Sequence, residues 1–434
     1  MAKEKLKKFT EYCEDLLPHE ISYLYSISKS KDSDRLNIMS HIHTKVMNGD
    51  YDFEFDLDID KRKYSKTLAW MKHELEKIDV DKRLVWISQC LQSLLLDQAT
   101  SELDQSILRA INKVQPNDYY FIYFYELLLQ YRQHLLIRMQ YQMYQRVNDF
   151  IERHQLDYKS SRLVFEQLHQ ATHDVIGTGG NSSHEAIQWK NWLYDNFKNT
   201  RLDGLIRHMS AIRYIFVCLQ YNMLGDIEKI LGELTAFFDS GQNYTRRLLV
   251  NLYDNLLVMY DQKQDYEKAR YYGYLSIKYD SLDAIIYRNN LVNLLIKMKQ
   301  YEEALDVIES ANFKLKNTRN FHSAIGFVSN HIRCLTNVGR HQEAITKARI
   351  FIQAYKSQVL KYRWHRFFSA FHEALYSGEL YSEIIKNTEK YKLHIKEKER
   401  SLNKKYKLIL NQYYQLSRFK SKLISESEYK ALVG

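Results

Sequence analysis

Two histidines spaced one helical turn apart are the first residues in this 434-residue chain whose types could do chemistry. His169 and His173 stand four positions apart, and Asp174 follows directly. On a helix, side chains at this spacing share a face, so two imidazoles could hold one metal ion. The further ligands of such a site are not evident. Because the chain holds 16 histidines, such a pair is expected without any function, and we predict no metal and no cofactor.

Two arginine–histidine pairs have the spacing of a second kind of site. Arg366 precedes His372 by six positions, and Arg35 precedes His41 by the same interval. The spacing resembles that of helical ribonucleases of the HEPN type. On one continuous helix, however, six positions turn two side chains about 120° apart, so they would not converge. No nucleophile elbow, Walker loop, HExxH motif or zinc knuckle is found. We therefore predict that the chain is not an enzyme, with a helical metal-dependent hydrolase or HEPN-like ribonuclease as the lesser alternative.

The elements that must position these residues are helices. Hydrophobic residues make up 45% of the chain, which is enough for a substantial core, and only 2 prolines and 13 glycines interrupt it. Strand-rich folds need frequent turn residues, and these are scarce here. The sequence therefore predicts an all-α fold of long helices joined by short polar turns.

The cysteines and the hydropathy pattern predict a cytoplasmic location. The four cysteines are far apart and lie inside apolar helical patterns, as buried free thiols do in a reducing compartment: Cys13, Cys90, Cys218 and Cys334. The N-terminus has no apolar run after its charges, so we expect no secretory signal. The most hydrophobic stretch, 119–137, is broken by polar residues, so we expect no membrane span. Richness in Lys, Tyr, Ile and Asn is typical of an AT-rich bacterial genome.

Residues 1–200 are predicted to form an irregular helical domain without repeats. We expect one helix to about Leu17, a second opened by Pro18, and three more at 34–48, 61–79 and 81–98. Acidic and apolar residues alternate over 50–60, which predicts an extended connector whose aromatic residues press onto neighbouring helices. After Pro116-Asn117-Asp118, an apolar and tyrosine-rich stretch runs to about Gln155. It is predicted to form one very long helix or two helices with a break. The glycine-rich segment 177–183 is a predicted hinge near the boundary of this domain.

The strongest pattern is a set of five turns that fall in register between 205 and 390. Each turn leads into the second helix of a predicted pair, and the five begin at Gly225, Gln264, Lys299, Gly339 and Glu379. Their spacings of 39, 35, 40 and 40 residues lie slightly above the period of about 34 residues of tetratricopeptide units, with the excess absorbed in loops. Residues 205–390 thus resemble a divergent tetratricopeptide repeat protein, best over 247–311. The resemblance implies an α-solenoid of about five helix pairs.

The register also predicts a groove. Asn255, Asn290 and Asn330 share one position in three consecutive units, and the resemblance implies that this position faces the concave surface. A carboxamide both donates and accepts hydrogen bonds, so a ladder of them could hold an extended peptide. Five further residues are expected to line the groove and to favour an acidic segment: Asn289, Asn293, Lys297, Arg333 and Arg366. We therefore expect a protein-binding scaffold or adaptor that captures a protein or peptide partner.

The positive charge of the chain gathers in its last segment. From Lys386 to the end there are 13 Lys and Arg against 5 acidic residues, which accounts for +8 of a net charge of +10. The simplest interpretation of 391–434 is a helical cap that closes the solenoid. The alternative is a nucleic-acid-associated or peptide-sensing regulatory protein, although 1–48 show no convincing helix-turn-helix. The basic residues that would contact a polyanion are Lys396, Lys398, Arg400, Lys404, Lys405 and Lys407.

Overall fold

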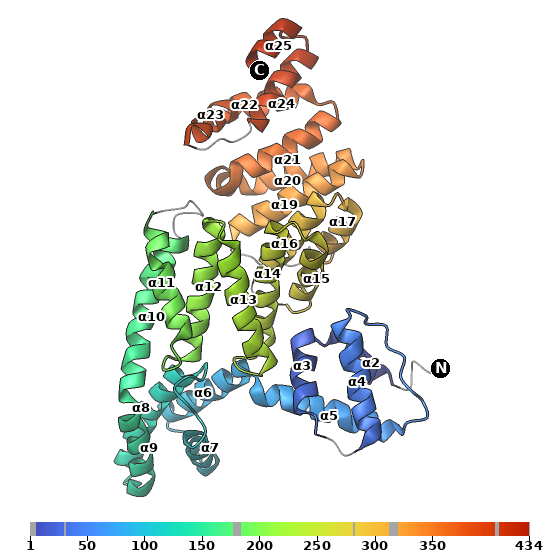
Figure 1. The fold of residues 1–434 in the computed structure, drawn as a ribbon. Helices are drawn as coiled ribbons and strands as arrows, with labels where there is room; N and C mark the ends of the chain where they lie inside the picture. The colour runs from blue at the N-terminus through green and yellow to red at the C-terminus, as the bar shows by residue number, and fades with distance from the viewer. Residues whose placement is uncertain are drawn as a thin grey trace. The chain divides into compact units, whose positions relative to one another are not determined.

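A computed structural model describes the chain except for residues 1–5, 30–31, 177–183, 281–282, 312–319, 404–407 and 434. Every regular element among the described residues is a helix, and helices pack against their neighbours in sequence, so the predicted all-α, solenoid-like fold is confirmed (Figure 1). The chain divides into two compact units, Met1–Asn255 and Leu256–Gly434. The domain boundaries expected near 200–205 and 390–391 stay a prediction, and the first repeat pair packs with N-terminal helices of the first unit.

The first unit begins with a small helical bundle whose boundaries follow the sequence signals. Pro18 occupies the first turn of its helix, where its missing N–H leaves no hydrogen bond unmade. Between the third and fourth helices, 50–60 form no helix, and Phe55 packs edge-on against Phe9 at 4.9 Å, as predicted for an aromatic connector. The helices of this bundle are α2 (Lys7–Asp15), α3 (Pro18–Ile27), α4 (Ser33–Met47) and α5 (Lys61–Ile78).

Six further helices of the first unit precede the predicted repeats. The apolar stretch to Gln155 is two helices with a break, and the break is a tight turn with Met139 in the left-handed region. Asp203 caps the helix that follows it and accepts a further hydrogen bond from the N–H of Ile122, at 2.9 Å. The predicted hinge at 177–183 lies outside the described residues. These helices are α6 (Val80–Leu95), α7 (Ser101–Ile111), α8 (Phe121–Ile137), α9 (Tyr141–Arg153), α10 (Gln155–Ile176) and α11 (His184–Lys198).

Five helix pairs follow, and each predicted turn region contains or adjoins the turn of one pair. Four turns have a left-handed residue at the predicted position, namely Gln264, Lys299, Gly339 and Glu379, with φ of 62°, 59°, 84° and 58°. The pairs are α12 (Gly204–Gln220) with α13 (Leu224–Asp239), α14 (Arg246–Gln262) with α15 (Tyr266–Ser276), α16 (Ala284–Lys297) with α17 (Tyr301–Glu309), α19 (Phe321–Asn337) with α20 (His341–Gln358), and α21 (Trp364–Ser377) with α22 (Tyr381–Lys390).

The first turn of the series corrects the predicted register by three residues. Its left-handed residue is Asn222, with φ of 55°, whereas Gly225 lies inside α13 and does not end α12. Asp226 also lies inside α13, and it pairs with Lys190 at 2.7 Å. Glycine is the commonest residue at such a turn, but asparagine also tolerates a positive φ, which is why the sequence misled.

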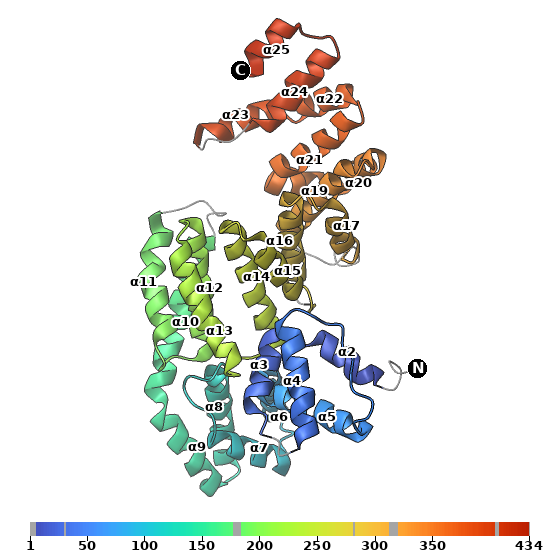
Figure 2. The same ribbon diagram turned by 45° about the vertical axis from the view of Figure 1, so that its right-hand side comes forward.

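The second unit stacks the first helices of successive pairs. α19 packs against both α16 and α21, and the three lie next to one another in Figures 1 and 2. Ala304 and Ala344 on the second helices are fully buried, and their small side chains let the two helices of a pair approach closely. The stack ends in α23 (Leu393–Asn403), α24 (Ile409–Lys420) and α25 (Glu426–Val433), of which α24 packs on α21 and α22.

The cysteines and the apolar helices were the subject of two further predictions. All four cysteines are buried free thiols, as predicted. Within the described residues, none of the helices combines the length and the apolar character that a bilayer crossing needs.

Candidate partner-binding site

A network of carboxamides joins the three stacked first helices of the second unit. The Nδ2 of Asn330 on α19 donates to the Oδ1 of Asn289 at 2.7 Å and to the Oδ1 of Asn293 at 2.9 Å, both on α16. The Oδ1 of Asn330 accepts from Nη2 of Arg366 on α21 at 2.9 Å, and the same nitrogen donates to Asn293. Four of the eight predicted groove residues therefore meet in one place.

Three guanidinium groups stand around this network, and we call them the guanidinium cluster: Arg333, Arg363 and Arg366. Their side chains are half-buried. Burial, and then the charges of the other two arginines, lowers the pKa of Arg366 to about 10, so the group stays charged at neutral pH.

The cluster carries more positive charge than its acidic neighbours balance. Arg333 has a partner in Glu373, although its Nε to Oε2 distance of 3.6 Å is too long for a hydrogen bond. Arg363 donates to the Nδ1 of His322, at 3.0 Å, and burial together with the charge of Arg363 lowers the pKa of that histidine. Among the described residues, no carboxylate forms an ion pair with Arg363 or Arg366.

The cluster also has an excess of hydrogen-bond donors over acceptors. Arginine carries five N–H donors and no acceptor. The Nε of Arg366 is buried without a partner, and Arg366 donates from its Nη2 to neutral oxygens. An unpaired buried donor is costly, so the arrangement favours a ligand that brings acceptor atoms and negative charge.

A glycine leaves room for the cluster. A Cβ built on Gly326 of α19 would lie 3.1 Å from Nδ2 of Asn289, 3.8 Å from Nη1 of Arg363 and 3.9 Å from Nε of Arg366. A side chain at this position would therefore crowd Asn289 and approach both arginines. Sequence reasoning missed Gly326, His322 and Arg363. The repeat register could have found the glycine, because it stands in its unit where Arg366 stands in the next.

The remaining predicted groove residues have other surroundings. Asn255 belongs to the first unit and donates to the backbone oxygen of Asn251, one turn earlier on its own helix, at 2.8 Å. Asn290 is half-buried on α16, and Lys297 forms an ion pair with Asp261 at 2.5 Å. Asn330 is only 1% exposed, so its carboxamide serves the internal network. The ladder of three equivalent asparagines stays a prediction.

The basic C-terminal segment contains a helix anchored to the stack. Within α23, Lys398 and Arg400 are exposed and Lys396 is half-buried. Lys404, Lys405 and Lys407 lie outside the described residues. Glu397, between the lysines, is 1% exposed and accepts hydrogen bonds from the N–H groups of Leu410 and Asn411, at 3.0 and 2.8 Å.

The predicted catalytic alternatives meet little support in the geometry. His169 and His173 are exposed on α10, and the described residues contain no group of three His, Cys, Asp or Glu that could hold a metal ion. His372 is completely buried, and neither of its ring nitrogens has a hydrogen-bond partner. It shares the continuous helix α21 with Arg366, and this helix begins before both residues.

The pair on α4 is also placed on one uninterrupted helix. Arg35 stacks on the ring of Trp70 at 4.7 Å, and His41 lies edge-on to Phe55. These aromatic contacts are packing interactions. Neither Arg–His pair therefore has a helix start between its members, the condition for convergence.

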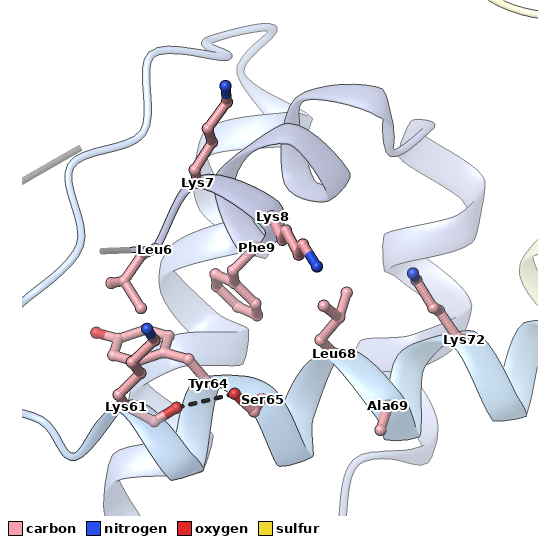
Figure 3. A pocket seen from close by; sticks show the side chains of 10 residues that line it. All are labelled: Leu6, Lys7, Lys8, Phe9, Lys61, Tyr64, Ser65, Leu68, Ala69 and Lys72. Carbon is pink, nitrogen blue, oxygen red and sulfur yellow. Dashed lines mark hydrogen bonds between the residues drawn. The ribbon is translucent and has the colours of Figure 1, made fainter. Parts of the chain in front are cut away.

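A second basic surface lies between α2 and α5 in the first unit. It is a pocket of about 610 Å³ whose lining combines apolar residues with four lysines (Figure 3). The ammonium groups of Lys8 and Lys72 flank Leu68 from the two helices (Figure 3). The lining residues Phe9 and Tyr64 are already only 3% and 2% exposed. A ligand would gain little further apolar burial there, so we place the candidate site in the second unit.

No family model, curated protein or solved structure matches the chain. The assignment of function therefore rests on the site.

Proposed function

We propose that the chain is a non-enzymatic scaffold or adaptor that captures a protein or peptide partner on the first helices of its second unit. The helix pairs are, in this proposal, divergent tetratricopeptide units. Shared left-handed turns and buried alanines of the second helices support that assignment.

The observation that carries the proposal is the guanidinium cluster with its carboxamide network. Repeat proteins bind through the surface formed by successive equivalent helices. Here α16, α19 and α21 supply side chains to one polar site, and each helix comes from a different pair. A site that exists only because three repeats are stacked is the kind of surface that a scaffold presents.

Site-directed photo-crosslinking in the native host tests the proposal. Asn337 is exposed on α19, one turn beyond Arg333, and donates to Glu373 of α21 at 3.2 Å. A photoreactive amino acid at position 337 should give a discrete crosslinked partner. The matched control is Thr346, which is exposed on the second helix α20 of the same pair.

The contrast between the two positions decides the outcome. Equal crosslinking at 337 and 346, or none at 337 under conditions where the chain is folded, would contradict capture by the first helices. Crosslinking confined to 337 is expected.

The nucleic-acid alternative is supported by a different observation, the exposed Lys398 and Arg400 on α23. Glutamates alternate with these cations and weaken the positive electrostatic potential of that helix. One of them, Glu397, accepts hydrogen bonds from backbone N–H groups inside the unit. It therefore ranks second.

A further inference from the structure

We infer that the guanidinium cluster is an oxyanion-binding site, which takes a carboxylate or phosphoryl group of the partner between Arg363 and Arg366. The inference rests on the proposed function and names the chemistry of the group that the partner must present.

The positive charges of Arg363 and Arg366 are not balanced by neighbouring carboxylates. Among the described residues, the two guanidinium groups of this half-buried site have only Asn330, Asn293 and His322 as hydrogen-bond partners, and all three are neutral. The undescribed stretches of the second unit cannot correct this balance. These stretches are 281–282, 312–319 and 404–407, and their sequences contain no Asp or Glu.

The geometry of Arg366 leaves some of its N–H donors for a ligand. Asn293 and Asn330 hold Arg366 through one nitrogen, Nη2, and leave Nε and Nη1 without a partner among the described residues. The planar guanidinium fork matches the paired oxygens of a carboxylate or a phosphoryl group. Gly326 keeps the space beside Nε and Arg363 free of a side chain. Asn330 is therefore a positioning residue, and the two arginines are the binding groups.

Charge balance separates this site from the other cationic side chains of the unit. Lys297 and Arg349 are paired with Asp261 and Glu383, each at 2.5 Å. Their charges are already balanced. Arg363 and Arg366 combine partial burial with the lack of such a partner, and this combination makes an anion bind in preference to water.

The test uses the full chain and four probes. Inorganic phosphate is titrated at constant ionic strength, and its effect on Tm is compared with that of chloride. Three otherwise identical extended peptides carry two glutamates, one phosphoserine or two glutamines, and their binding is followed by fluorescence anisotropy. The first two peptides distinguish the two sources of an oxyanion, and the third is neutral.

Three variants locate the site. Arg366→Gln should weaken binding of the preferred anionic peptide by about tenfold or more, while Arg349→Gln, an equal change of charge elsewhere in the unit, should not. Arg363→Gln provides a second test at a residue that donates to the exposed His322. Circular dichroism confirms that each variant keeps its helical content.

Asn293→Asp is the sharpest variant. The substitution is nearly isosteric and keeps the oxygen that accepts from Arg366, but it places a carboxylate beside the guanidinium. This built-in anion should raise Tm and abolish binding of phosphate and of both anionic peptides.

Four results would overturn the inference. They are equal binding of the neutral and anionic peptides, no binding of any anionic probe, unchanged binding by Arg366→Gln and Arg363→Gln, and full binding by Asn293→Asp. Partner crosslinking at position 337 that persists in Asn293→Asp would leave the scaffold function standing while removing the oxyanion role. Absence of that crosslinking in the unaltered chain would instead remove the proposed function.

Discussion

Buried polar side chains decide what individual residues do in this chain. Asn330 uses its carboxamide completely within the network of α16, α19 and α21. His372, in the middle of α21, is also fully buried but has no partner at either ring nitrogen. A satisfied buried group orders a site, whereas an unsatisfied one lowers stability.

Replacing His372 by Leu should therefore stabilise the second unit by about 1–3 kcal/mol at pH 7, because it removes an unpaired buried polar group at similar volume. Urea unfolding followed by circular dichroism measures the change. A less stable variant would mean that the imidazole has a partner in solution.

The same histidine predicts a pH dependence. Burial lowers the pKa of His372 to about 3, while the unfolded chain takes up its proton near 6.5. The stability contributed by a neutral His372 is thus fully present above pH 6.5 and is lost as the pH falls from 6.5 toward 3. In His372→Leu the stability should fall less steeply over that window. Equal slopes would contradict the assignment.

At the scale of elements, the C-terminal helices belong to the packed body of the second unit. Leu393 of α23 and Leu410 of α24 are fully buried in the core that also holds Phe367 and Phe368. Glu397 fastens the start of α24 by accepting two of its N–H groups, and it also pairs with His365 of α21 at 2.7 Å. Deleting residues 392–434 would therefore expose core, which makes deletion a poor test of charge.

Glu397→Ala should cost about 2–4 kcal/mol, because three hydrogen bonds to one buried carboxylate are removed together. Limited proteolysis should then cut selectively within 391–434. Lys398→Ala, a change at the adjacent exposed residue, is the control and should leave cleavage unchanged. Protection of this segment in Glu397→Ala would show that packing alone holds α24.

At the scale of the whole molecule, the net charge of +10 favours contact with a polyanion at one of the basic surfaces. The candidates for contact with a polyanion are α23 in the second unit and the lysine-lined pocket between α2 and α5 in the first. Both surfaces carry several cationic side chains.

Substitutions to glutamine separate the two surfaces without removing helices. Replacing Lys396, Lys398 and Arg400 should lower the slope of log affinity for DNA against log salt by about 0.9 for each phosphate that is no longer neutralised. Replacing Lys8, Lys61 and Lys72 is the matched change in the pocket and should have a smaller effect. The reverse ranking in a salt titration would place the polyanion contact in the first unit.

The sequence by itself determined the helices and most of their turns. Scarce Pro and Gly, apolar periodicity and signals such as Pro18 are local, and a helix forms through local hydrogen bonds, so its boundaries could be predicted from neighbouring residues. The turn at Asn222 was misplaced because Gly225 is the stronger local signal, while the packing of α12 on α13 selects the other residue.

Only the tertiary structure decided where the units divide and which polar residues meet. The sequence placed Asn289, Asn293, Arg333 and Arg366 together, because a repeat register predicts equivalent positions. It could not distinguish Lys297, balanced by Asp261, from Arg366, which has no such partner. Charge balance depends on distances between side chains of different helices, and these distances are set by how α16, α19 and α21 stack.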